Sequence, residues 1–210
     1  MPELVCYRAS SYLTPVRARA HGWSSTGRYH DWGSPATQYL SLHPLTPWAE
    51  LVRNQRCRDL DDALETRIAI WAIRLVLDEE PAAVDFDAAA AGALATRIEP
   101  AELVADDARE CRALAEAHRA DPSAAKVIRV PSAALPGTDN IVIFGRRRAI
   151  RYEATPLRPI QVPAAVSSVD GRLPRDLFRL VRRLGDPHAG YEGWRHGERY
   201  ELSAISTDSL

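Results

Sequence analysis

The chain has 210 residues, 46% of them apolar and 26% charged, which is the composition of a globular protein that buries its own core rather than of a disordered chain. Its formal net charge of −1 argues against a protein that grips nucleic acid through the backbone phosphates. The three cysteines are scattered, with no C-x-x-C pair, and so fit reduced cytoplasmic thiols better than a disulfide framework or a structural zinc site.

The N-terminal part of the sequence predicts two strands separated by a long loop. Residues 4–8 (L-V-C-Y-R) and residues 37–42 (T-Q-Y-L-S-L) have the character of short strands. Residues 10–35 between them are rich in serine, glycine and aromatic side chains, and this predicts a loop. Loops of this kind often carry the binding residues of a site.

A helix is predicted directly after the second strand. Thr46 suits the N-cap position and Pro47 suits the first helical position, which places Glu50 in the first turn. The next apolar stretch, residues 67–77, is dense in β-branched residues that partly alternate with other side chains. We favour a strand there, and a helix is the open alternative.

The remaining pattern alternates between helices and strands. Further elements are predicted as helices over residues 85–96 and 106–120 and as strands over residues 126–130, 140–144 and 150–153. The tail beyond residue 156 is richer in proline and predicts one basic amphipathic helix over residues 175–184, ended by Gly185.

Six polar side chains are candidates for a functional site. They lie within the predicted elements, next to their ends, or in the first loop: Arg8, Arg28, Tyr39, Glu50, Ser132 and Asn140. Each has an ordinary structural explanation when it is taken alone. An arginine is commonly a surface cation, a strand tyrosine commonly fills the core, and a glutamate early in a helix complements the helix dipole. Their order along the chain is more informative than any one of them.

Short motifs in this order resemble the RES domain family. They are Y-R at 7–8, G-R-Y at 27–29, Q-Y-L-S at 38–41, W-A-E at 48–50, V-P-S-A at 130–133 and N-I-V-I-F at 140–144. The family is named for an arginine, a glutamate and a serine, which the resemblance assigns here to Arg8, Glu50 and Ser132. The family usually has tryptophan after G-R, followed by a residue such as asparagine, where this chain has Tyr29 and His30.

The resemblance implies an α+β fold similar to that of ADP-ribosyltransferases, with a split, mostly antiparallel β core, flanking helices and a cleft for NAD⁺. It implies a RES domain over residues 1–156, and we expect residues 157–210 to form a C-terminal extension packed on the same domain. Characterised members degrade NAD⁺, some by phosphorolysis, and at least one modifies a protein. Many are toxins that pair with a helix-turn-helix antitoxin.

The residues suit cleavage of the nicotinamide–ribose bond, by phosphorolysis or by hydrolysis. This reaction builds positive charge on the ribose, which a carboxylate such as Glu50 stabilises, and Ser132 can orient Glu50 or the ribose. Guanidinium groups suit the diphosphate, and an aromatic ring can stack on nicotinamide. The expected contacts to NAD⁺ are Arg8, Arg28, Tyr39 and Asn140. NAD⁺ is then a substrate, inorganic phosphate is the co-substrate of phosphorolysis, and no step requires a metal.

Several alternatives stay open from the sequence. The same cleft can transfer ADP-ribose to a protein, or it can belong to a non-catalytic module that binds NAD⁺ or an adenine nucleotide. Arginines at 146–151 and 175–183 offer a nucleic-acid surface, which the neutral total charge disfavours. The six histidines form no i, i+4 pair and no H-E-x-x-H, so we expect no metal site.

Location and partners follow from the same features. No stretch approaches the ~20 apolar residues of a membrane span, and residues 1–10 lack the apolar core of a signal peptide. We expect a cytoplasmic protein that contacts neither membrane nor nucleic acid directly. Whether a cognate antitoxin exists, and whether the chain forms a homo-oligomer, stays open.

Overall fold

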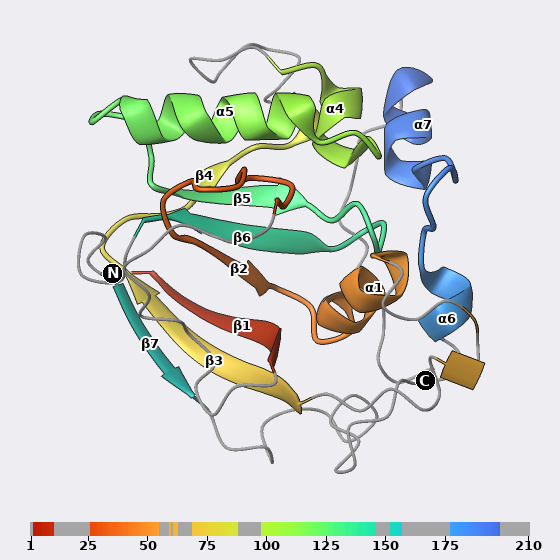
Figure 1. The fold of residues 1–210 in the computed structure, drawn as a ribbon, viewed down its shortest axis with the longest axis horizontal. Coiled ribbons are helices and arrows are strands. Elements are labelled where there is room, and N and C mark those ends of the chain that lie inside the picture. The colour runs from red at the N-terminus through yellow and green to blue at the C-terminus, as the bar shows by residue number, and fades with distance from the viewer. Residues whose placement is uncertain are drawn as a thin grey trace.

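A mostly antiparallel sheet of seven strands organises the fold, in the order β4-β5-β6-β2-β1-β3-β7 (Figure 1). The computed structural model describes residues 2–10, 26–54, 59, 61–62, 69–87, 98–145, 152–156 and 177–197. The strands are β1 Glu3–Ser10, β2 Thr37–Ser41, β3 Ala69–Leu77, β4 Ala82–Ala83, β5 Val127–Pro131, β6 Asp139–Phe144 and β7 Tyr152–Pro156. The helices are α1 Thr46–Arg53, α4 Pro100–Val104, α5 Arg109–Ala120, α6 Leu177–Leu180 and α7 Ala189–Arg195.

The sheet is divided into two halves that meet at one residue pair. Strand β1 is joined to β2 through Tyr7 and Ser41, whereas β1 and β3 pair continuously from Glu3 to Ser10. Figure 1 shows a gap between β1 and β2, whereas β1 and β3 lie side by side. Among the described strands, β4 and β5 alone pair in parallel. These features confirm the predicted α+β class with a split, mostly antiparallel core and flanking helices.

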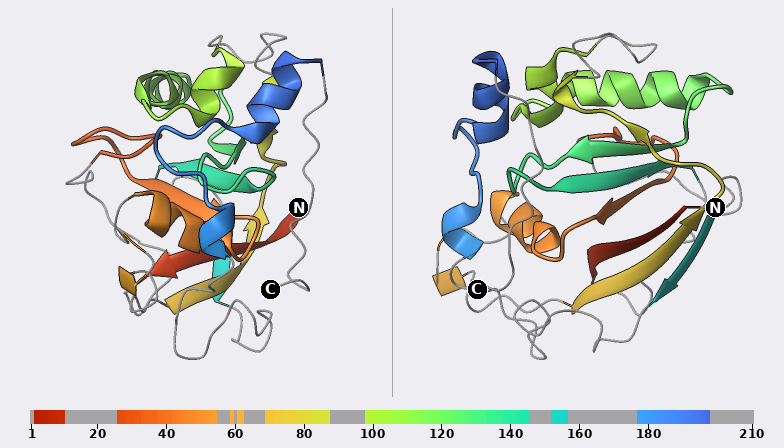
Figure 2. Two further views of the ribbon diagram at one scale, coloured as in Figure 1. Left: turned by 90° about the vertical axis from the view of Figure 1, so that its right-hand side faces the viewer. Right: turned by 180° about the vertical axis from the view of Figure 1, so that it is seen from behind.

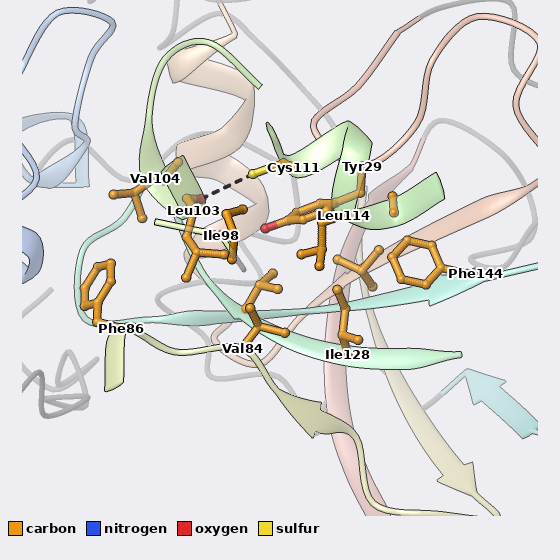
Figure 3. Close-up of a cluster of buried hydrophobic side chains, with 14 residues drawn as sticks. Tyr29, Val84, Phe86, Ile98, Leu103, Val104, Cys111, Leu114, Ile128 and Phe144 are labelled. Carbon is orange, nitrogen blue, oxygen red and sulfur yellow. Dashed lines mark hydrogen bonds between the residues drawn. The ribbon is translucent and has the colours of Figure 1, made fainter. Parts of the chain in front are cut away.

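Helices cover one face of the sheet, with one group on each half. Helices α4 and α5 pack on the half formed by β4, β5, β6 and β2, through buried side chains that include Phe86, Leu103, Leu114 and Ile128 (Figure 3). Helix α1 packs on the other half through a second cluster that includes Trp48. A third buried cluster lies on the opposite face of the strands and contains Cys6, Leu40, Ile73, Leu75, Leu77, Ile141 and Ile143.

The predicted strands are confirmed where the structure describes them, and the open stretch at 67–77 contains strand β3. Two predictions about α1 are wrong. Leu45 is the N-cap, and Thr46 is the first helical residue, so Glu50 lies beyond the first turn. The Thr46 hydroxyl is fully buried and donates to Thr138 Oγ1 at 2.9 Å, because a tertiary partner replaces the local cap.

The predicted helix over 175–184 is also wrong in extent. In the described residues it is limited to α6, which ends at Leu180, because the Arg182 amide turns away to donate to the Ala134 carbonyl at 2.8 Å. Gly185 has a positive φ of 90° but caps no helix, and its amide donates to Asp106 Oδ2 at 2.6 Å. Helix α7 follows and was not predicted.

Some predictions fall outside the described residues. They are most of the loop at 10–35, the alanine-rich helix from residue 88 onward, and the basic run at 146–151. The division of the chain at residue 156 stays a prediction. None of the helices in the described part of the chain has both the length and the apolar character that a bilayer span requires.

The buried Arg53 side chain fastens the C-terminal segment, residues 177–197, to α1. The Arg53 guanidinium, on a residue 4% exposed, forms an ion pair with Asp106 and also donates to the carbonyls of Arg182 and Arg183 at 3.1 Å each. Asp106 also forms an ion pair with Arg182, with Nη2 and Oδ1 3.1 Å apart. Figures 1 and 2 show this segment running along one end of the sheet, from beside α1 to beside α4.

We predict that Asp106→Ala lowers the free energy of unfolding by about 1–3 kcal/mol, because it leaves a buried guanidinium without its counter-ion. The matched control is Asp78→Ala, at an exposed aspartate after β3, with an expected change below about 0.5 kcal/mol. Denaturant unfolding of both variants measures this. Equal losses would show that the Arg53–Asp106 pair does not hold the segment.

Candidate active site

Glu50 lies at the centre of a group of polar side chains from three different elements. Its Oε1 atom accepts hydrogen bonds from Ser132 Oγ and Asn140 Nδ2, each at 3.3 Å. Ser41 Oγ in turn donates to Asn140 Oδ1 at 2.8 Å and so fixes the orientation of that amide. The structure therefore brings together three residues that the sequence singled out, Glu50, Ser132 and Asn140.

Strand register explains this convergence. Val130, Asn140, Ser41 and Tyr7 are successive partners across β5, β6, β2 and β1, so their side chains share one face of the sheet. Tyr7 packs against the α1 cluster, which identifies this face as the one that α1 covers. The site thus lies beside the Tyr7–Ser41 pair at which the two half-sheets meet.

The Ser132 hydroxyl has a fixed direction. It accepts hydrogen bonds from the amides of Ala134 at 3.2 Å and Leu135 at 3.1 Å, which use its two lone pairs. Its single proton is then directed to Glu50. Ser132 is fully buried and Glu50 is half-buried, so the hydrogen bond has little competition from water.

Arg28 lies on a tight turn held by its neighbours. The turn closes through the Gly27 amide, which donates to the His30 carbonyl at 2.8 Å. The guanidinium donates to the Ala105 carbonyl just beyond α4, from Nη2 at 2.6 Å. Burial lowers the pKa of Arg28, but the nearby side chains of Cys111, Tyr29 and Glu50, in that order of effect, outweigh burial and raise it above its ordinary value. Arg28 is therefore a half-buried cation whose pKa is raised in part by Glu50.

Tyr39 supports this turn. Its hydroxyl accepts from the Tyr29 amide at 2.9 Å and is hydrogen-bonded to His30 Nδ1 at 2.7 Å. Burial raises the pKa of Tyr39, so the phenol stays protonated at neutral pH. The structure thus gives Tyr39 a role in holding Arg28, and its stacking on nicotinamide stays a prediction.

Arg8 is not brought to this group. Its Nη1 atom donates to Gln38 Oε1 at 2.6 Å, and strand alternation directs its side chain to the face opposite that of Tyr7. A role for Arg8 in binding the diphosphate stays a prediction.

The sequence interpretation missed two contributors to the site. Ser41 lay within the motif Q-Y-L-S, but only the register shows that it orients Asn140. No motif in the proline-rich tail indicated a role for His188, yet its Nε2 donates to the Ser132 carbonyl at 3.0 Å. Among the described residues, no group of three or more His, Cys, Asp or Glu side chains is placed to hold a metal ion.

Comparisons with known proteins agree with the sequence motifs. A family model described as RES domain matches residues 5–164. The chain is similar to a chain in the crystal structure of the M. tuberculosis MbcT–MbcA toxin-antitoxin complex, with a TM-score of 0.51 and 19% identity over 76% of this chain and 86% of that chain. At this identity the likeness shows the fold. No curated protein sequence gave a match.

The buried His188 predicts a pH dependence of stability. Burial, together with the charges of Arg182, Arg53 and Arg28, lowers its pKa to about 4 from the ordinary 6.5. Between these values the unfolded chain binds a proton that the native protein does not, so stability falls as the pH drops from 6.5 to 4. The expected loss from this group is about 3 kcal/mol.

Denaturant unfolding of the wild type and of His188→Gln at pH 7 and pH 4 isolates this contribution. The wild type should lose about 3 kcal/mol more than the variant over this interval. An equal loss in the two proteins would show that His188 titrates normally in the native state.

Proposed function

The chain belongs to the RES domain family, and on that basis we propose that it is an enzyme that cleaves the nicotinamide–ribose bond of NAD⁺. The observation that carries the proposal is the convergence of Ser132 and Asn140 on one oxygen of Glu50. A carboxylate fixed in this way is suited to stabilise positive charge that develops next to it. A module that only binds nucleotides has no need of such an arrangement.

The reaction places charge where Glu50 can act. When the bond between ribose C1′ and the nicotinamide nitrogen breaks, its electron pair stays with nicotinamide, and the ribose becomes oxocarbenium-like. The hydrogen bonds from Ser132 and Asn140 hold the Glu50 carboxylate before the reaction starts, so little reorganisation is needed in the transition state. Water or inorganic phosphate then forms the new bond to C1′, and water releases a proton to solvent.

Arg28 is our candidate for the diphosphate of NAD⁺. Its planar guanidinium can donate two parallel hydrogen bonds to phosphate oxygens, and the 27–30 turn and the Ala105 carbonyl already hold it. Asn140 is proposed to contact NAD⁺ from the same face as Glu50. Arg8 and Tyr39 are retained as proposed contacts, although the contacts observed for them are with Gln38 and with the 27–30 turn.

We further propose that the protein is the toxin of a toxin–antitoxin pair and acts in the cytoplasm. The support for the pair is the likeness in fold to a chain from a toxin-antitoxin complex. A helix-turn-helix antitoxin is the expected partner. The two described cysteines, Cys6 and Cys111, are free and buried, which fits a reducing compartment.

Glu50→Gln tests the proposed mechanism, because it keeps the shape and hydrogen-bonding capacity of the side chain but removes its charge. We expect kcat for NAD⁺ cleavage to fall at least about 100-fold, with near-normal NAD⁺ binding and thermal midpoint. Glu110→Gln, at an exposed position in the first turn of α5, is the matched control and should retain full activity. A fully active Glu50→Gln enzyme would contradict the assigned role.

Arg28→Lys should lower kcat/KM by an amount equivalent to about 1.5–3 kcal/mol, because lysine lacks the planar fork. Arg8→Lys, measured in parallel, tests whether the arginine on the opposite face also contacts substrate. A loss of the same size at Arg8 would support that role, and an unchanged kcat/KM would remove it. If Arg28→Lys retains full kcat/KM, the diphosphate does not bind at this turn.

A further inference from the structure

Three consecutive buried carbonyl groups in the turn after β5 accept hydrogen bonds from one C-terminal segment. His188 Nε2 donates to the Ser132 carbonyl at 3.0 Å. Arg182 donates to the next two, from Nη1 to Ala133 at 3.3 Å and from its amide to Ala134 at 2.8 Å. The three turn residues are at most 3% exposed, so water cannot readily replace these donors. This segment therefore helps to hold the turn, together with the turn's own hydrogen bond from the Ser132 amide to the Thr138 carbonyl at 2.8 Å.

The imidazole of His188 has one tautomer that fits its contacts. Nδ1 accepts from the Tyr191 amide at 3.3 Å, so the ring proton belongs on Nε2, where it is donated to Ser132. The ring is 3% exposed and lies edge-on to Phe86, with centroids 6.0 Å apart. Burial, aided by the nearby arginines, lowers its pKa to about 4, so this neutral form persists at neutral pH.

The same segment is fastened to the helix that carries Glu50. Arg53 follows Glu50 by three positions on α1, and its Nη1 atom donates to the carbonyls of Arg182 and Arg183. The segment is thus bonded both to the turn of Ser132 and to the helix of Glu50. It lies outside residues 5–164, to which the family model applies.

We propose that His188 is a positioning residue of the active site. By holding the Ser132 carbonyl, it sets the turn in which the Ala134 and Leu135 amides bind Ser132 Oγ and leave the hydroxyl proton directed at Glu50. The consequence for catalysis rests on the proposed NAD⁺-cleaving function. The consequence for the turn itself does not, and the two can be measured separately.

Three variants test the proposal. His188→Leu fills the space without a donor, and His188→Gln keeps an N–H that can reach the Ser132 carbonyl. Leu77→Ala is the control for lost packing, since Leu77 is buried in the third cluster, on the opposite face of the sheet. Amide hydrogen exchange reads out the turn at Ala134 and Leu135, normalised to the core amide of Val142 in β6.

In His188→Leu we expect the two turn amides to exchange at least about tenfold faster relative to Val142, and kcat to fall at least about tenfold with little change in KM. His188→Gln should restore both properties to within about threefold of the wild type. Leu77→Ala should lower the thermal midpoint but change neither the normalised exchange nor kcat.

Turn amides that stay as protected in His188→Leu as in Leu77→Ala would overturn the proposal. Faster exchange in His188→Leu with kcat equal to that of Leu77→Ala would overturn the catalytic part of it. If the wild type cleaves no NAD⁺ while the exchange results hold, His188 still positions Ser132 and it is the proposed function that fails.

Discussion

The two halves of the sheet meet at one residue pair, Tyr7 with Ser41, and the candidate site is built at this junction. A continuous sheet would bury the face beside Ser41 under regular packing. Here the halves diverge. The row of paired residues across the sheet starts with the apolar Val130 and continues with the polar Asn140 and Ser41. Helix α1 follows β2 after four residues and brings Glu50 over this row. The half-buried Glu50 carboxylate therefore lies beside the junction between the two half-sheets.

Keeping that carboxylate in place requires every polar group around it to have a partner. Ser132 Oγ, the Ser132 carbonyl and the Asn140 amide are each hydrogen-bonded, and their partners come from the turn after β5, the C-terminal segment and β2. Unpaired buried polar groups cost about 1–3 kcal/mol each, so the site is stable only as a complete network. This explains why residues far from the family motifs contribute to it.

Much of the fold and part of the site could be predicted from the sequence, because runs of β-branched residues identify strands and the motif order identifies Glu50, Ser132 and Asn140. The rest depended on tertiary partners. Thr46 has the chemistry of a helix cap, but Thr138 supplies a buried partner instead. The face on which Arg8 lies follows from strand register, which local sequence does not encode.

The structure of the C-terminal tail also could not be predicted from local sequence. Its basic residues predicted a continuous amphipathic helix, yet the Arg182 amide bonds to the turn of Ser132 and ends the helix early. His188 becomes part of the site only because the chain returns to that turn. Neither contact has a local sequence signal, since both join residues about 50 positions apart.

The activity proposed for this site is cleavage of NAD⁺ at the nicotinamide–ribose bond. The most direct measurement is chromatography of the products after the purified protein is incubated with NAD⁺, with and without inorganic phosphate. We expect release of free nicotinamide, together with ADP-ribose in the absence of phosphate or its 1″-phosphate in the presence of phosphate. Nicotinamide released with ADP-ribose attached to protein would keep the site and change the acceptor. Intact NAD⁺ after incubation with folded protein under both conditions would exclude the proposed activity.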